Sequence, residues 1–140
     1  MDPVTAIGLT ASLVNIMDAA MKVVGIINDI KGATKEQAML IQEVTSLLPF
    51  LSSLKTRIEF ANKTEPWFAR ALVLGAPNGA IALLDVAITE LSRRLHKLYE
   101  RNKVSRSLGW VLKKEECNAM LVRIERAKSL ITAELQGDIL

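Results

Sequence analysis

The chain has 140 residues, of which 50% are hydrophobic, 24% are charged and only 4% are aromatic, and its net charge is +3. This apolar content excludes an intrinsically disordered chain, and the length suits one domain, residues 1–140, with a core that needs no disulfide or metal. Leu, Ile, Val, Ala and Met supply nearly all of the apolar mass, which favours helices over sheets.

The first predicted helix covers residues 4–30, and its N-terminal part is unusually apolar. Residues 3–17 carry no charge. Apolar side chains occupy much of the circumference, as in a helix that is buried on most sides or enters lipid. Asp2 stands where a secretory signal has Lys or Arg. Asp18 and Lys22 interrupt the apolar run before it reaches the length of a constitutive membrane span.

The second predicted helix opens with Thr34 and Gln37, which have the spacing of a capping box. Pro49 lies inside the helical pattern and predicts a kink near residues 45–49, not a boundary between two domains. The apolar residues of this helix recur at alternating spacings of four and three, which predicts one buried seam. They are Leu40, Val44, Leu47, Leu51, Leu54 and Ile58.

A break at residues 62–66, a short helix at about 67–74 and a loop at 75–79 precede the third long helix. We expect Asn78 to cap that helix, and its seam residues are Ile81, Leu84, Ile88, Leu91, Leu95 and Leu98. A polar hinge at 101–107 leads to the last helix, at about 113–136, which Gly137 ends. Its inner line is Met120, Ile124, Ala127 and Ile131, flanked by Leu121 and Leu135.

Four amphipathic helices joined by short connections predict an all-α fold, a four-helix bundle with an additional short helix at about residues 67–74. No enzyme, cofactor or metal is predicted. The loop 75–79 lacks the Gly-Lys-Ser/Thr ending of a phosphate-binding loop. Cys117 and His96 are the only cysteine and histidine, and His96 lies off its helix's seam. Glu115 and Glu116 suit a helix start, where acidic side chains favour the macrodipole.

Charge is concentrated in residues 93–128, which hold eleven Lys and Arg against four Glu, a local +7. The ordinary interpretation is a solvated face, and the functional ones are contact with anionic lipid or with nucleic acid. No aromatic interleaving supports nucleic acid, which we do not expect as a partner. The candidate contacts for anionic lipid or a protein partner are Arg93, Arg94, Lys97, Arg101, Lys103 and Arg106.

Two stretches of the chain resemble one known family. The opening Met-Asp-Pro-Val-Thr-Ala-Ile-Gly-Leu at residues 1–9, and Leu-Gly-Trp-Val-Leu-Lys-Lys-Glu-Glu at 108–116 with the helix around 121–130, are similar to the fungal HeLo-like domains. Those domains stand at the N-terminus of NACHT-type STAND receptors, the fungal NLRs, and of related cell-death effectors. The resemblance implies a bundle akin to that of the necroptotic mixed-lineage kinase-like pseudokinase, forming the N-terminal part of a longer protein.

The resemblance also implies a function in fungal innate immunity and heterokaryon incompatibility. A cytoplasmic domain of this kind oligomerises, relocates to the anionic lipids of the plasma membrane and permeabilises it, causing programmed cell death. Its partners are other copies of itself and a NACHT or NLR receptor or an amyloid-signalling protein. The corresponding membrane-inserting residues, in which Gly8 and Ala11 are the small ones, are Val4, Ile7, Gly8, Leu9, Ala11, Leu13, Val14 and Met17.

The alternative is a helical signalling adaptor that binds another protein without lipid contact. In this interpretation the apolar first helix is ordinary core, and the basic residues 93–128 meet an acidic partner.

Overall fold

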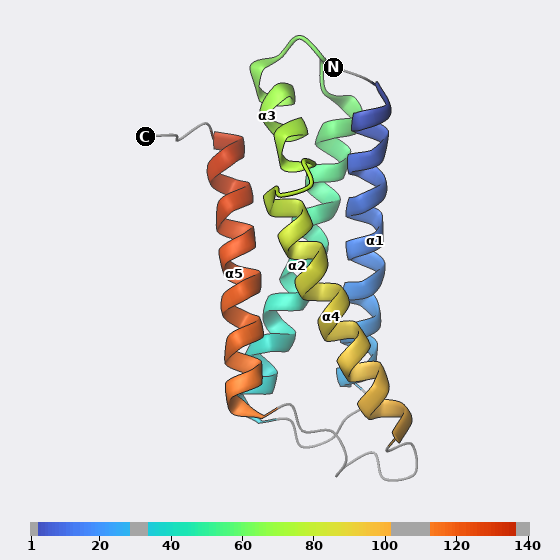
Figure 1. The fold of residues 1–140 in the computed structure, drawn as a ribbon, viewed down its shortest axis with the longest axis vertical. Helices are drawn as coiled ribbons and strands as arrows, with labels where there is room; N and C mark the ends of the chain where they lie inside the picture. The colour runs from blue at the N-terminus through green and yellow to red at the C-terminus, as the bar shows by residue number, and fades with distance from the viewer. Residues whose placement is uncertain (1–2, 29–33, 102–112, 137–140) are drawn as a thin grey trace.

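The computed structural model describes residues 3–28, 34–101 and 113–136, and only the backbone at 3–5, 28, 98–99 and 101. Within these ranges the chain forms five helices and no strand (Figure 1), which confirms the all-α bundle with a short additional helix. The helices are α1 (Pro3–Asn28), α2 (Lys35–Phe60), α3 (Pro66–Leu74), α4 (Ala80–Arg101) and α5 (Lys114–Gln136).

The four long helices form a ring in which each packs against two neighbours. α1 and α5 both pack against α2 and α4, so that α1 and α5 lie on one diagonal of the bundle. α1 and α4 run in one direction, and α2 and α5 run in the other (Figure 1). Because α2 and α4 lie on the second diagonal, the chain between them crosses one end of the bundle, and α3 occupies this crossing.

Each long helix buries one line of residues spaced alternately three and four apart, as near-parallel helix packing requires. The seams predicted for α2 and α5 are confirmed, and so is that of α4 as far as Leu95, since the side chain of Leu98 lies outside the described set. Gln37 and Cys117 extend the seams of α2 and α5 at their N-terminal ends.

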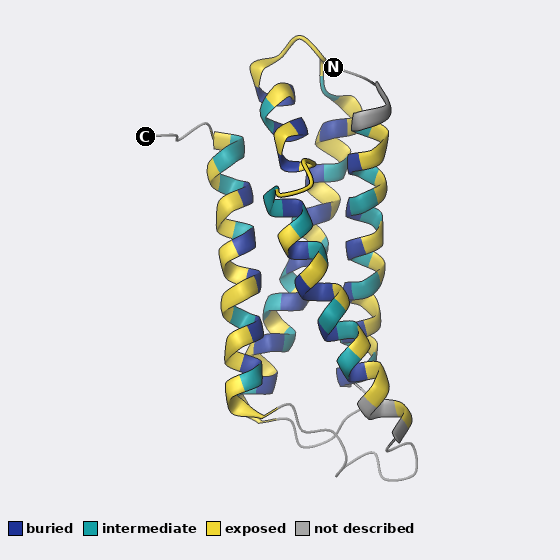
Figure 2. Cartoon of the chain, in the orientation of Figure 1, coloured by how far each residue is buried: buried dark blue, intermediate teal, exposed yellow. Residues whose placement is uncertain are grey.

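Of the two expectations for α1, burial on most sides is wrong, and entry into lipid stays a prediction. Its buried residues follow the same alternation of four and three (Figure 2). The reason is its position at a corner of the ring, where only two long helices cover it and the rest of its circumference faces outward. The buried residues of α1 are Leu9, Leu13, Ile16, Ala20, Val23 and Ile27.

The capping box of α2 is confirmed. The Gln37 backbone N–H donates to Thr34 Oγ1 at 3.2 Å, and the Thr34 N–H donates to Gln37 Oε1 at 2.9 Å. α2 then continues through Pro49, which is exposed. The segment is one helix, as predicted, and the kink at residues 45–49 stays a prediction.

The α3 segment closes the end of the bundle. Its helix begins with Pro66 in the first turn, where a missing N–H costs nothing. It buries Trp67 and Phe68, and the Arg57 guanidinium of α2 lies 3.9 Å from the centre of the Trp67 ring. The short helix expected at 67–74 is therefore confirmed, one residue longer.

The prediction that Asn78 caps α4 is wrong, because α4 begins at Ala80. Gly79 is the flanking residue, and packing explains the glycine: a Cβ there would lie 2.5 Å from the Leu74 carbonyl oxygen. The hinge at 101–107 beyond Arg101, the Trp110 stretch and Gly137 lie outside the described residues.

Candidate functional site

The outward face of α1 is the first candidate surface. Residues Ala6–Ile27, a stretch of 22 with a mean hydropathy of 1.5, are long and apolar enough to cross a membrane, by length and composition only. Core helices of soluble proteins and signal sequences meet the same criterion. In α1, 28% of the qualifying stretch is buried, a share similar to that of α2, which buries seven of its 26 residues. What distinguishes α1 is that its outward face is also apolar, with Ile7 66% and Met21 51% exposed.

The eight predicted membrane-inserting residues do not share one face. Leu9 and Leu13 are buried in the seam with relative exposures of 3% and 0%, whereas Ile7 is 66% exposed. Val14 and Met17 are half-buried, Gly8 and Ala11 are exposed, and the side chain of Val4 is not described. The whole set can therefore meet lipid only if α1 leaves the bundle.

Two glycines of α1 have no packing role among the residues that the structure describes. A Cβ at Gly8 or at Gly25 would have no atom within 4 Å. Glycine lowers helix stability by about 1 kcal/mol relative to alanine, so α1 carries this cost twice with no close approach inside the bundle to explain it.

The basic residues of 93–128 are partly paired with acids from other helices. Arg94 lies 3.3 Å from Glu116, Lys114 3.8 Å from Glu36, Arg123 3.0 Å from Glu90 and Lys128 3.4 Å from Glu43. Glu36, Glu43 and Glu90 precede the basic segment in the sequence, so folding lowers its effective charge below the local +7. The hydrogen bond from Arg123 is the main cause that holds the pKa of Glu90 below its usual value.

The residues predicted to contact anionic lipid or a protein partner differ in the same way in exposure and pairing. Arg93 and Lys97 are exposed on α4, while Arg94 is half-buried and turned toward Glu116 of α5. The side chain of Arg101 is not described, and Lys103 and Arg106 lie outside the described residues.

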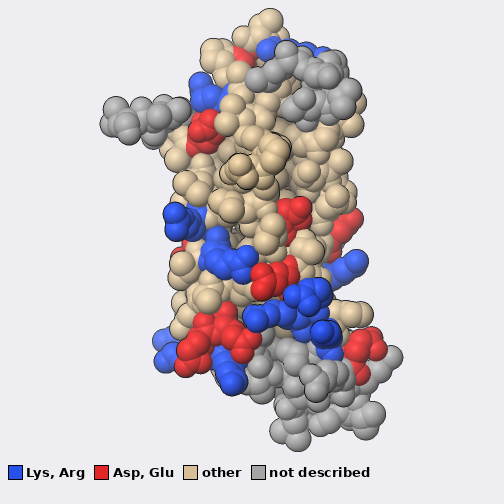
Figure 3. Space-filling model, viewed as in Figure 1, with Lys and Arg blue, Asp and Glu red and all other residues tan. Residues whose placement is uncertain are grey.

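The basic residues and the start of α1 lie at opposite ends of the bundle. Arg93 and Lys97 are in the C-terminal half of α4, and α1 and α4 run in the same direction from the end closed by α3 (Figure 1). In the view of Figure 3, charged side chains gather over the lower half of the molecule, and the surface around the upper half is mostly uncharged. A membrane that meets one end of the closed bundle does not meet the other.

A groove of about 1010 Å³ runs between α1 and α4. Its charged side chains are of both signs, with Asp18 and Lys22 from α1 facing Arg93 and Glu100 from α4, and His96 also lines it. His96 is exposed, as expected, but it belongs to this groove and not to an isolated surface position.

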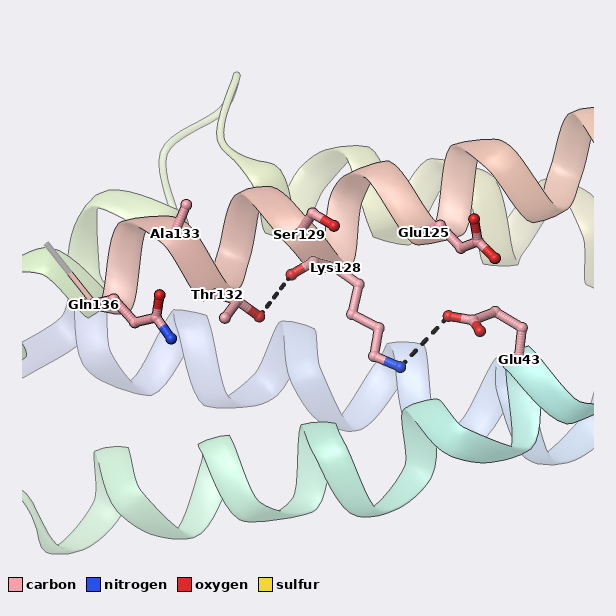
Figure 4. A pocket seen from close by; sticks show the side chains of 7 residues that line it. All are labelled: Glu43, Glu125, Lys128, Ser129, Thr132, Ala133 and Gln136. Atoms are coloured by element: carbon pink, nitrogen blue, oxygen red, sulfur yellow. Dashed lines mark hydrogen bonds and ion pairs between the residues drawn. The ribbon is translucent and has the colours of Figure 1, made fainter. Parts of the chain in front are cut away.

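A second hollow lies between α2 and α5, and Lys128 is its most connected residue (Figure 4). Its ammonium group pairs with Glu43, donates to Ser46 Oγ at 3.1 Å and lies 5.7 Å from the Phe50 ring centre. The Thr132 hydroxyl donates to the Lys128 carbonyl oxygen at 2.9 Å, a local bond within α5. The contacts of Lys128 with Glu43 and Ser46 therefore stabilise the packing of α5 on α2. The described groups do not form a chain of hydrogen bonds that would let a base activate a hydroxyl.

Reactive chemistry has little support among the described residues. They hold no group of three or more His, Cys, Asp or Glu side chains that could bind a metal. Cys117 is buried in α5, and burial, together with the nearby charges of Glu116 and Glu36, raises the pKa of its thiol. A protonated, inaccessible thiol is a poor nucleophile.

Comparison of the chain with protein-family models, with curated proteins and with solved structures finds no match.

Proposed function

We propose that the chain is a membrane-targeting cell-death execution domain of the fungal HeLo-like type, which permeabilises the plasma membrane after oligomerisation. It waits in the cytoplasm as the closed bundle, and assembly driven by a NACHT or NLR receptor or an amyloid-signalling partner releases α1. The observation that carries this proposal is the combination in α1 of a span-length apolar stretch with large apolar side chains, Ile7 and Met21, exposed on its outward face. The family resemblance of residues 1–9 and 108–130 adds support.

The free energies of moving α1 from the bundle into lipid explain why a single closed bundle stays inactive. The six seam residues of α1 are out of water both in the bundle and in lipid, but departure of α1 exposes the buried seam residues of α2 and α4 that it covers, and this loss of burial opposes release. Asp18 and Lys22 are exposed to water in the bundle, and each costs about 2.5–3.5 kcal/mol at the centre of a membrane. Several α1 helices side by side pair these opposite charges away from lipid, which makes insertion dependent on assembly.

The test puts charge on α1 without disturbing the core. Ile7 and Met21 are 66% and 51% exposed, so Ile7→Asp and Met21→Asp leave the bundle folded but raise the cost of insertion. We expect both variants, fused to an inducible oligomerisation module, to lose dye release from anionic vesicles. Met39→Asp, at a 44% exposed position of α2, is the matched control and keeps it. Dye release equal to wild type in all three variants would refute the proposal.

A specific observation favours the adaptor as a second candidate. The groove between α1 and α4 presents charges of both signs and suits a polar protein segment. If Arg93→Glu with Lys97→Glu abolishes capture of a protein partner while dye release is absent in every form of the chain, the adaptor function replaces the membrane function.

A further inference from the structure

The end of the bundle where α2 finishes and α1 starts carries unusually exposed apolar side chains. Phe60, the last residue of α2, is 84% exposed, the highest value among the large exposed hydrophobic residues of the described chain, and Ile7 of α1 is 66% exposed. A hollow of about 280 Å³ lies between the first turns of α1, the end of α2 and Phe68 of α3, where Ile7 and Glu59 line it and Phe60 does not. We call this end the tip, defined by Ile7, Phe60, Ala61, Lys63 and Phe68.

The sequence pattern could not assign a role to Phe60. It lies two positions beyond the last seam residue, Ile58, and the helical spacing shows only that it is off the seam. Its exposure follows from its place on the outward face of α2, since Ile58 and Ala61 on either side of it pack against the core. The feature of the sequence that could have indicated an exposed site is an aromatic residue that lies off the buried seam and just before the helix break at residues 62–66.

The few charges around the tip have a small positive excess. Residues 55–70 hold four Lys and Arg against two Glu, of which Lys55 and Glu59 pair with each other. Lys63 is exposed and lines the hollow beside Ile7, while Arg57 is held over the Trp67 ring at 3.9 Å. An exposed aromatic residue three positions from an exposed lysine, as in Phe60 and Lys63, fits the way in which peripheral proteins enter the headgroup region.

The position of the span-length stretch connects the tip to α1. Ala6 and Ile7 are the first residues of α1 whose side chains the structure describes, and they belong to that stretch and line the hollow of the tip. Contact through the tip therefore brings the first turns of α1 to the lipid before the helix is released. If the bundle met the membrane through Arg93 and Lys97, the first turns of α1 would lie at the end of the bundle that faces away from the lipid.

We propose that the tip, and not the basic half of α4, makes the first contact with the membrane. Phe60 enters the lipid interface and Lys63 binds anionic headgroups, so that the closed bundle stands on the end where α1 starts. This inference rests on the proposed function, since it assigns the orientation in which that function begins.

The first experiment compares two exposed positions of one helix. Phe60 and Met39 are 21 positions apart in α2, which separates them by about 31 Å along the helix axis. We expect Phe60→Ser to weaken binding of the full chain to phosphatidylcholine–phosphatidylserine vesicles about tenfold. Met39→Ser should leave the binding unchanged. Lys63→Glu should weaken binding to these vesicles and have little effect on vesicles of phosphatidylcholine alone.

A second measurement reads the orientation directly. In a Cys117→Ala background, a nitroxide on Phe60→Cys should be immersed in lipid, and one on Met39→Cys should stay in water. Thermal unfolding followed by circular dichroism confirms that each variant is folded.

The outcomes separate the two proposals. If the wild-type chain binds vesicles of neither composition and releases no dye when oligomerised, the membrane function itself fails. If the wild-type chain binds but Phe60→Ser binds equally well, or the label at 39 enters lipid in place of the label at 60, the tip is overturned and the membrane function stands.

Discussion

Lys128 and Glu43 connect α5 to α2 across 85 positions of the sequence, with the ammonium nitrogen 3.4 Å from the carboxylate oxygen. Their side chains are only 29% and 19% exposed, so water screens the pair less than a surface ion pair. We expect Lys128→Met and Glu43→Gln each to lower the free energy of unfolding by about 1 kcal/mol. Urea unfolding of both single variants and the double variant measures the coupling.

The control for this cycle is the pair Lys55 and Glu59, which lies within α2 and is more exposed. Its coupling should be at most about 0.5 kcal/mol. If the effects of the Lys128 and Glu43 substitutions on the free energy of unfolding simply add, the interpretation that Lys128 and Glu43 stabilise the contact between α5 and α2 is contradicted.

The glycines should respond in opposite directions. Gly8→Ala and Gly25→Ala should each raise the free energy of unfolding by up to about 1 kcal/mol, because α1 gains helix propensity and the new Cβ meets nothing within 4 Å. Gly79→Ala should lower it, because the Cβ would lie 2.5 Å from the Leu74 carbonyl oxygen. Thermal unfolding of the three variants checks this, and a loss of stability at Gly8 would show that its surroundings are filled.

A cavity in the buried seam of α1 should show whether dye release depends on the departure of α1 or only on the overall stability of the bundle. Ile16 in α1 and Ile124 in α5 are both fully buried, and truncation of either to Ala should cost about 2–5 kcal/mol. Under the proposed function, only Ile16→Ala should lower the degree of assembly needed for dye release. Equal effects of the two variants would mean that general instability, and not departure of α1, causes the leakage.

Cys117 should react slowly with a thiol-specific disulfide reagent. The thiol is 1% exposed and its pKa is raised, mainly by burial, so both access and the thiolate fraction are reduced. We expect the rate in the folded chain to be about 100-fold or more below that in urea. Since the unfolded thiol ionises at the lower pH, stability should fall as the pH rises above about 8.5. Cys117→Ala should remove this part of the pH dependence.

Glu90 should give the opposite pH response. Arg123 donates a hydrogen bond to this carboxylate, and this bond, with the charges of Arg123, Arg94 and Arg93, holds the pKa of Glu90 below its ordinary value. The contribution to stability is therefore present above the ordinary pKa and is lost as the pH falls through the lowered one. The difference in melting temperature between wild type and Glu90→Gln should shrink as acid is added, and a constant difference would contradict it.

The helices and three of the four seams were predictable because a spacing of three and four places residues on one helix face. Burial of α1 was not predictable, because its hydrophobic content does not reveal that only two long helices cover it. The charge of 93–128 was overestimated for a similar reason. Glu36, Glu43 and Glu90 are distant in sequence from Lys114, Lys128 and Arg123, and only the ring order of the helices brings them together.

The diagonal connection through α3 has a consequence for how the bundle opens. α1 is the first helix of the described chain, and the crossing segment joins α2 to α4 while α5 contacts both. Among the described elements α1 packs against α2 and α4, with a smaller contact to α3, and after its departure α5 still packs against both α2 and α4. The ring order of the described helices therefore allows the bundle to open at one corner while the packing of α5 on α2 and α4 is kept.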